Sequence, residues 1–131
     1  MNGAIALKQY QQMGVHGAIM DASPHRLIQM LLDGALTRIL AAKGHMKQNN
    51  VAKKGQQIGN AISIIESLKA SLDFEQGGEI SKNLDALYEY LGYILLKANT
   101  NNSFELLDEA GQLISQIKMG WDAIDPNAAQ R

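Results

Sequence analysis

Histidine is the side chain in this sequence best suited to bind a metal or to transfer a proton, and the chain has three: His16, His25 and His45. No two of them are three or four residues apart, the spacing that puts two imidazoles on one helix face. A di-iron site in a helical bundle needs Glu-x-x-His on two helices, and the sequence contains no Glu-x-x-His. Met30 and Met46 are potential haem ligands, but methionine on an apolar helix usually fills a core. We therefore predict histidines at solvated or helix-end positions, no metal site and no cofactor.

The other motifs that carry catalysis are also missing from the sequence. The chain has no cysteine, which excludes thiolate metal sites and a cysteine nucleophile. Its one glycine pair, Gly77-Gly78, lacks the further residues of a dinucleotide or Walker phosphate loop, and Glu79 directly after it would repel an anion. The predicted helix seams carry no paired carboxylates for acid–base chemistry. We predict that the protein is not an enzyme and has no small-molecule substrate.

The elements that would position any functional residue are helices. Two prolines mark their outer limits: Ser23-Pro24 has the pattern of a helix start, and Asp125-Pro126 has that of a stop. Between them, apolar residues recur at alternating steps of three and four, the pattern of an a/d helix seam. Four such seams follow one another: Ile28, Leu32, Ala35, Ile39, Ala42 and Met46; Ile58, Ala61, Ile65, Leu68 and Leu72; Ile80, Leu84, Leu87, Leu91, Ile94 and Ala98; and Leu107, Ala110, Ile114, Ile117, Trp121 and Ile124.

Three short polar breaks separate the four seams, at residues 47–50, 73–78 and 99–102. The Asn, Asp and Gly residues in these breaks are the types that turns and helix caps require, and Asn102 with Glu105 has the pattern of a capping box. Short connections force successive helices to run antiparallel. The sequence therefore predicts an all-α fold, an antiparallel up-and-down four-helix bundle with a short N-terminal helical segment.

The prediction divides the chain into three parts. Residues 23–124 form the four-helix bundle domain. Residues 1–22 form an N-terminal flap segment, in which glycines interrupt a weak helix near residues 4–13. Residues 125–131 form a flexible tail.

Composition narrows the class of protein. Apolar residues make up 46 % of the 131-residue chain, charged residues 19 % and aromatic residues 5 %, a globular composition that favours helices. The net charge of −1 argues against the concentrated basic surface that nucleic-acid binding needs. No apolar run approaches the roughly 20 residues that span a bilayer, and the first residues lack a signal-peptide pattern. We predict a soluble cytoplasmic protein that binds no nucleic acid and does not insert into a membrane.

The predicted helices carry more large apolar residues than four seams can use. Either the core is wider than the seams and a flanking segment packs on it, or some of these side chains line grooves for a partner helix. The sequence leaves both interpretations open. The candidates for such a groove, placed by helix geometry, are Met30, Leu36, Leu40, Ile62, Tyr88, Tyr93, Leu95 and Leu113.

Two long sequence motifs resemble a known family. They are residues 22–35, ASPHRLIQMLLDGA, and residues 72–84, LDFEQGGEISKNL, the second followed by Leu87-Tyr88-Glu89-Tyr90. Together with Ala98-Asn99 and the late Trp121, they resemble the bacterial flagellar secretion chaperones of the FliS family. The resemblance extends from residue 10 to about residue 124, nearly the whole chain.

The resemblance implies a four-helix bundle that binds the disordered C-terminal segment of flagellin in the bacterial cytosol. It implies that the protein prevents premature polymerisation and hands flagellin to the flagellar type III export apparatus. Whether the export gate is a second partner stays open. In the family, an N-terminal segment that includes a tyrosine lies over or beside the client groove. That role falls to Tyr10, and with it to Ile5, Leu7 and Met13. Three roles stay open for Tyr10: a displaceable cover, a permanent part of the fold, or a direct contact with flagellin.

Two other functions stay open beside the flagellin chaperone. One is a helical bundle that binds another protein partner, which co-purification of that partner would reveal. The other is a ligand- or metal-binding bundle, such as an electron carrier, which a colourless and metal-free preparation would reject.

Overall fold

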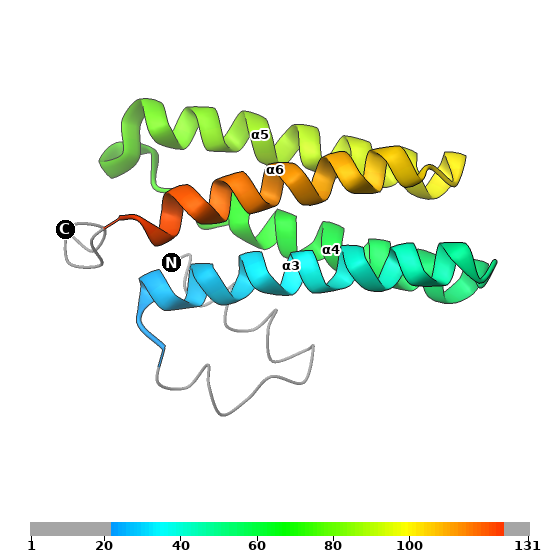
Figure 1. Ribbon diagram of the computed structural model, residues 1–131. Coiled ribbons are helices and arrows are strands. Elements are labelled where there is room, and N and C mark those ends of the chain that lie inside the picture. Colours follow the sequence, from blue (N-terminus) through cyan, green and yellow to red (C-terminus); the bar gives the residue numbers. More distant parts are fainter. Residues whose placement is uncertain (1–21, 125–131) are drawn as a thin grey trace.

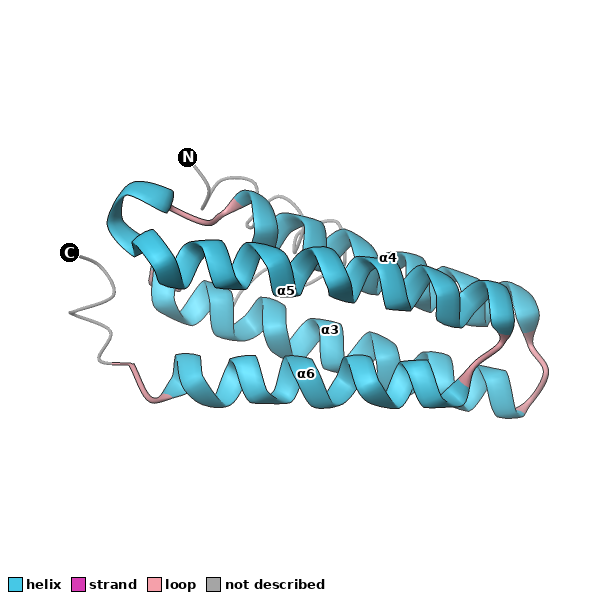
Figure 2. Ribbon diagram, turned by 90° about the horizontal axis from the view of Figure 1, so that it is seen from above, coloured by secondary structure: helices cyan, strands magenta, loops and turns pink. Residues whose placement is uncertain are grey.

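Four long helices make up the part of the chain that the structure describes, residues 22–124 of a computed structural model (Figure 1). They are α3 (Pro24–Lys47), α4 (Val51–Ala70), α5 (Phe74–Asn101) and α6 (Phe104–Asp122), and these residues contain no strand. Each helix packs on the next in sequence, and α6 returns to pack on α3. The helices run up and down along roughly one axis (Figure 2). The predicted all-α antiparallel four-helix bundle is therefore confirmed, while the predicted N-terminal segment and the tail lie outside the described residues.

A side-chain cap fixes the start of the first helix of the bundle. Ser23 Oγ accepts a hydrogen bond of 3.1 Å from the Arg26 N–H, and Pro24 is the first helical residue, which confirms the predicted start. Such a cap contributes about 1 kcal/mol of stability relative to alanine. At the other end of the bundle sequence, α6 stops at Asp122. The predicted stop at residues 125–126 follows shortly after and lies outside the described residues.

The predicted capping box before α6 is wrong by one residue. Ser103, not Asn102, is the N-cap, because its Oγ accepts a hydrogen bond of 3.2 Å from the Leu106 N–H. Asn102 instead ends α5 in the left-handed conformation, with φ 52°, which asparagine tolerates better than most residues. The break predicted at residues 99–102 is therefore shorter, since α5 continues through most of it.

The break predicted at residues 73–78 is also largely helical. Asp73 Oδ1 accepts hydrogen bonds of 3.0 Å from the N–H groups of Glu75 and Gln76, so a helical turn begins directly after Asp73. Gly78 then interrupts the helix with φ 50° and ψ −122°, and α5 continues beyond it. Glycine adopts this backbone conformation without the strain that a side chain would bring. A polar, glycine-containing segment is thus a kinked helix start rather than a loop.

Most residues of the four predicted seams are buried or pack against the core, and two at one end of the bundle are exposed. Seam residues such as Leu32, Ile65 and Leu91 are at most 1 % exposed. Ile80 and Ile124, the first residue of the third seam and the last of the fourth, are 69 % and 39 % exposed, so their predicted core positions are wrong. Both lie where α5 begins and α6 ends, so that few neighbouring helical turns remain to cover them.

Candidate functional site

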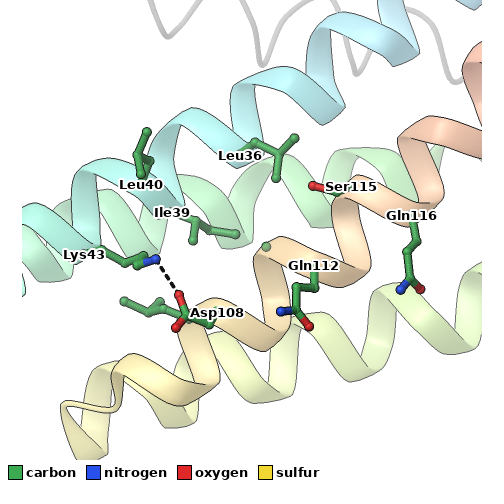
Figure 3. A pocket seen from close by; sticks show the side chains of 10 residues that line it. Leu36, Ile39, Leu40, Lys43, Asp108, Gln112, Ser115 and Gln116 are labelled. Atoms are coloured by element: carbon green, nitrogen blue, oxygen red, sulfur yellow. Dashed lines mark ion pairs between the residues drawn. The ribbon is translucent and has the colours of Figure 1, made fainter.

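A groove runs along the bundle surface between α3 and α6 (Figure 3). We call it the α3/α6 groove. Its volume is about 490 Å³. The residues that line it are Leu36, Ile39, Leu40 and Lys43 from α3, and Leu107, Asp108, Gly111, Gln112, Ser115 and Gln116 from α6.

Polar contacts between the two helices establish which residues face each other across the groove. Three side-chain pairs that cross from α3 to α6 define the register: Gln29 with Asp122 at 2.7 Å, Asp33 with Lys118 at 3.5 Å, and Lys43 with Asp108 at 2.5 Å. As the residue number on α3 rises, the number of the facing residue on α6 falls by the same amount, as expected for antiparallel helices in constant register. The same register places Leu36 opposite Ser115 and Leu40 opposite Gly111, and Figure 3 shows Leu36 extending toward Ser115.

The floor of the groove is apolar, and one helix contributes a glycine to the lining. Ile39 and Leu107 are 3 % and 0 % exposed. A Cβ added to Gly111 would lie 3.9 Å from Ile39 Cγ2, an ordinary contact, so even a methyl group there would raise the floor. On α6, the residue opposite Leu40 is Gly111, which has no side chain, and Leu40 is 69 % exposed.

Ion pairs stand at both ends of the groove, and its middle carries no free charge. At one end, the Lys118 ammonium lies 2.7 Å from an Asp122 carboxylate oxygen; this hydrogen bond raises the pKa of Lys118 and lowers the pKa of Asp122. Residues 110–117 of α6 carry no charge. The one charged residue in the middle of α3, Arg38, is turned toward α4, where it donates a hydrogen bond of 3.3 Å to Gln57.

The lining of the groove is suited to hold an apolar segment. The groove has an apolar floor, an exposed leucine on its α3 rim, and the polar side chains of Gln112, Ser115 and Gln116 on its α6 side. Among residues 22–124, no three His, Asp or Glu side chains gather in a way that could hold a metal ion. A groove between two helices that is apolar at its base is the geometry in which an amphipathic helix docks.

His25 and Trp121 join the start of α3 to the end of α6 near the groove. Their rings stack with centroids 4.9 Å apart and an angle of 15° between the planes. His25 Nε2 lies 3.0 Å from the Trp121 carbonyl oxygen, and Trp121 Nε1–H donates to the His25 carbonyl oxygen, also at 3.0 Å. His25 therefore has the helix-end role that the sequence predicts, and this pair holds the two walls of the groove in register.

A second hollow, of about 300 Å³, lies at the opposite end of the bundle and includes a buried lysine. Lys54 is 5 % exposed, and its Nζ donates to the Asn99 carbonyl oxygen at 3.1 Å and to Asn102 Oδ1 at 3.0 Å. A cation at the C-terminal end of a helix satisfies carbonyl groups that lack helical partners. We assign Lys54 to the capping of α5 rather than to ligand binding.

The structure brings two of the predicted groove residues, Leu36 and Leu40, together in the α3/α6 groove. Three others, Met30, Tyr88 and Leu95, are at most 6 % exposed and belong to the core, so they do not line the groove. For these three the alternative interpretation, a core wider than the seams, is the one that the structure confirms. Burial raises the pKa of Tyr88 to about 12.

The remaining predicted residues lie away from the groove or outside the described part. Ile62 on α4 and Leu113 on α6 are half-buried against the core, and Tyr93 is exposed on α5. The N-terminal residues Ile5, Leu7, Tyr10 and Met13 lie outside the described residues.

The α6 side of the groove was not predicted from the sequence; it includes Gly111, Gln112, Ser115 and Gln116. Small and amide side chains do not appear in a search for apolar residues. A signal was nevertheless present: residues 110–117 form an uncharged stretch in the middle of a helix whose two ends are charged. The solvent-facing positions of a surface helix usually carry charges.

None of the helices within residues 22–124 combines the length and the hydropathy that crossing a lipid bilayer requires.

Comparison with known proteins places the chain in a family. The family described as "Flagellar protein FliS" matches residues 6–128. Flagellar secretion chaperone FliSB of Pseudomonas aeruginosa is 49 % identical over 119 residues, which cover 91 % of this chain and 94 % of the relative. Flagellar secretion chaperone FliS of Salmonella typhimurium is 43 % identical over 130 residues, 98 % of this chain and 96 % of the relative, and that of Vibrio cholerae is 40 % identical over 121 residues, 92 % and 89 %. The chain therefore belongs to the FliS family of flagellar proteins.

Proposed function

We propose that the protein is a cytoplasmic export chaperone for flagellin. In this proposal it binds the disordered C-terminal segment of flagellin, prevents premature polymerisation and hands the subunit to the flagellar type III export apparatus, with the export gate as a second partner. The observation that carries the proposal is the α3/α6 groove, in a chain whose relatives are named flagellar secretion chaperones. An apolar groove can cover an amphipathic segment by burying its apolar face, and this needs no nucleotide hydrolysis.

Leu36 and Leu40 are the groove residues that we propose contact the client. We further propose that the N-terminal segment, through Tyr10 and its neighbours Ile5, Leu7 and Met13, covers the groove while no client is bound. An uncovered apolar groove would favour aggregation, and the apolar side chains of this segment suit it as a cover.

Titration calorimetry with a peptide that covers the flagellin C-terminus tests the proposal, with a scrambled peptide of the same composition as control. We expect saturable binding with a negative heat-capacity change, because apolar surface is buried, and modest salt dependence, because the middle of the groove is uncharged. A heat-capacity change near zero, or an affinity that collapses between low and high salt, would contradict the proposed binding mode. No binding of the flagellin peptide would refute the proposed client.

Thermal unfolding with and without EDTA tests the rival function of a metal-binding bundle. A bound metal would stabilise the folded state, so its removal would lower the Tm. We expect the Tm to be unchanged, and a fall of several degrees would support the rival.

A further inference from the structure

The α3/α6 groove lies on a helix seam that is regular in spacing but incomplete in side chains. On each helix, four residues follow one another at steps of three, four and three, the a/d spacing of a coiled coil. They are Asp33, Leu36, Leu40 and Lys43 on α3, and Asp108, Gly111, Ser115 and Lys118 on α6. In a complete seam, a side chain from each helix fills the space between residues of the other. Here ion pairs occupy the two outer positions, and the middle pairs a leucine with glycine and a leucine with serine.

Two apolar side chains are therefore missing from the α6 side of this seam. Gly111 contributes no side chain opposite Leu40, which explains why a leucine at a seam position is 69 % exposed. Ser115 contributes only a hydroxymethyl group opposite Leu36 (Figure 3). The space that two larger side chains would occupy is the middle of the groove.

We propose that the client supplies these two side chains. It inserts a pair of large apolar residues, three or four apart on a helix, one beside Gly111 and one beside Ser115. This inference rests on the proposed function and specifies how the client is recognised. The spacing follows from the groove, because Gly111 and Ser115 are themselves one helical turn apart.

The ion pairs set the length and charge of the stretch that the groove accepts. Asp33 and Lys43 are ten residues apart on α3, and ten residues of helix span about 15 Å. Lys43 and Asp108 neutralise each other at one end, whereas at the other end Asp33 and Asp122 share the single ammonium of Lys118. A client charge placed between the two ends would lose hydration without gaining a partner of opposite sign. The recognised motif is thus two apolar anchors within a run of about ten uncharged residues.

The α6 rim adds a preference for the residues beside the anchors. Gln112 and Gln116 are exposed, and their side-chain amides make no hydrogen bond within residues 22–124. Their amides can both donate and accept, so they suit Asn, Gln, Ser or Thr side chains on the client.

An alanine scan of the flagellin C-terminal peptide against the full chain, repeated against the Ser115→Leu variant, tests the inference. With the unsubstituted protein, we expect two apolar peptide positions, three or four residues apart, at which alanine weakens binding at least tenfold. Ser115→Leu fills one of the two spaces, so it should weaken the unsubstituted peptide at least tenfold. In that variant, alanine at one of the two anchors should have less than a twofold further effect.

The matched control is Ser63→Leu, the same change at an exposed position on α4. It should leave the affinity and both anchors unchanged, and thermal unfolding checks that both variants fold. If Ser115→Leu is unstable, Gly111→Ala makes a smaller filling at ordinary contact distance and should weaken binding while reducing the effect of the other anchor. The inference is overturned if the scan finds no two apolar positions three or four residues apart at which alanine weakens binding. It is also overturned if alanine at each anchor weakens binding to the variants as much as to the unsubstituted protein. Neither result would refute flagellin as the client. A peptide that does not bind the unsubstituted protein refutes the proposed function, and this inference with it.

Discussion

The α3/α6 groove and the outer face of α5 both expose large apolar side chains, but in different shapes and charge environments. The groove is concave, and its leucines lie in an uncharged stretch between two ion pairs. The outer face of α5 presents Tyr90, Tyr93 and Leu96 on one convex helix, with exposed fractions of 41 %, 59 % and 59 %.

Charged groups already engage the tyrosines of α5. The Tyr90 hydroxyl donates to the Glu109 carboxylate, and this hydrogen bond raises the pKa of Tyr90. The Lys97 ammonium lies 5.7 Å from the centre of the Tyr93 ring. A partner that covered this face would have to desolvate these charges. Both surfaces are exposed and apolar, so exposure alone does not distinguish them; we propose the groove as the docking site because it is concave and its middle carries no charge.

Filling the groove with a side chain should give the largest loss of client affinity. Gly111→Leu places a side chain where we propose the client inserts one, so client affinity should fall at least 100-fold, about 2.7 kcal/mol. Replacing a helical glycine should leave stability equal or raise it by about 0.5–1 kcal/mol, so the loss would not reflect unfolding. Calorimetry with the flagellin peptide measures the affinity, and chemical denaturation measures the stability.

Gly59→Leu on α4 is the matched control for this variant. Gly59 is exposed, and a Cβ added there meets no other atom within 4 Å. The control should gain similar stability and bind the client normally. Equal affinities for the two variants would show that the client binds outside the groove.

The tyrosines of α5 also differ by burial, and alkaline pH should reveal it. Tyr88 is 3 % exposed and has a pKa of about 12, whereas an unfolded tyrosine titrates near 10. As pH rises, the unfolded state loses this proton first, so stability is complete below about pH 10 and declines between 10 and 12. The loss should reach about 2 kcal/mol near pH 12, at ~1.4 kcal/mol per pH unit.

Denaturant titrations at pH 9, 10 and 11 measure this decline, and Tyr88→Phe removes the titrating hydroxyl. The variant should show a flatter dependence of stability on pH than the unsubstituted chain. An identical slope in both proteins would assign the decline to other groups.

The bundle was predictable from the sequence because its seams repeat a simple rule. Leu32, Ile65 and Leu91 recur at helical spacing, and burying apolar side chains at that spacing requires helices packed together. The ends were less predictable, because capping depends on local geometry. Ser103 rather than Asn102 caps α6, and the turn after Asp73 becomes helical through the Asp73 cap.

The groove was predictable only on its α3 side. Leu36 and Leu40 stand out as apolar residues beyond the seam. Gly111 and Ser115 help to form the groove because their small side chains leave space unfilled. A search for the periodicity of apolar residues does not detect positions where an apolar side chain is absent. Whether a surplus residue such as Leu95 joins the core depends on how all four helices pack, which no single helix pattern contains.

Removing the cover that we propose for the groove should change client binding less than filling the groove does. If the N-terminal segment leaves the groove only about a tenth of the time, apparent client affinity is reduced about tenfold. Tyr10→Ala should then speed client association by up to about tenfold and increase binding of an apolar dye, with little loss of stability. Stopped-flow fluorescence measures the association rate. A stability loss of ~2–4 kcal/mol would show that Tyr10 is a permanent part of the fold, and faster dissociation would show a direct contact with flagellin.

Two exposed leucines, one on each surface, test which of the two surfaces the client covers. Leu40 borders the groove and Leu96 lies on the outer face of α5, with exposed fractions of 69 % and 59 %. Truncating either to alanine should change stability by less than about 0.5 kcal/mol, because neither side chain packs in the bundle core. If the client covers Leu40, Leu40→Ala should weaken binding about fivefold, ~1 kcal/mol, since the client then loses part of an apolar contact. Leu96→Ala should weaken it less than twofold. Because both variants make the same chemical change on similarly exposed helix positions, any difference in affinity between them reports where the client lies. A larger loss of affinity for Leu96→Ala than for Leu40→Ala would indicate that the client binds the outer face of α5 rather than the α3/α6 groove.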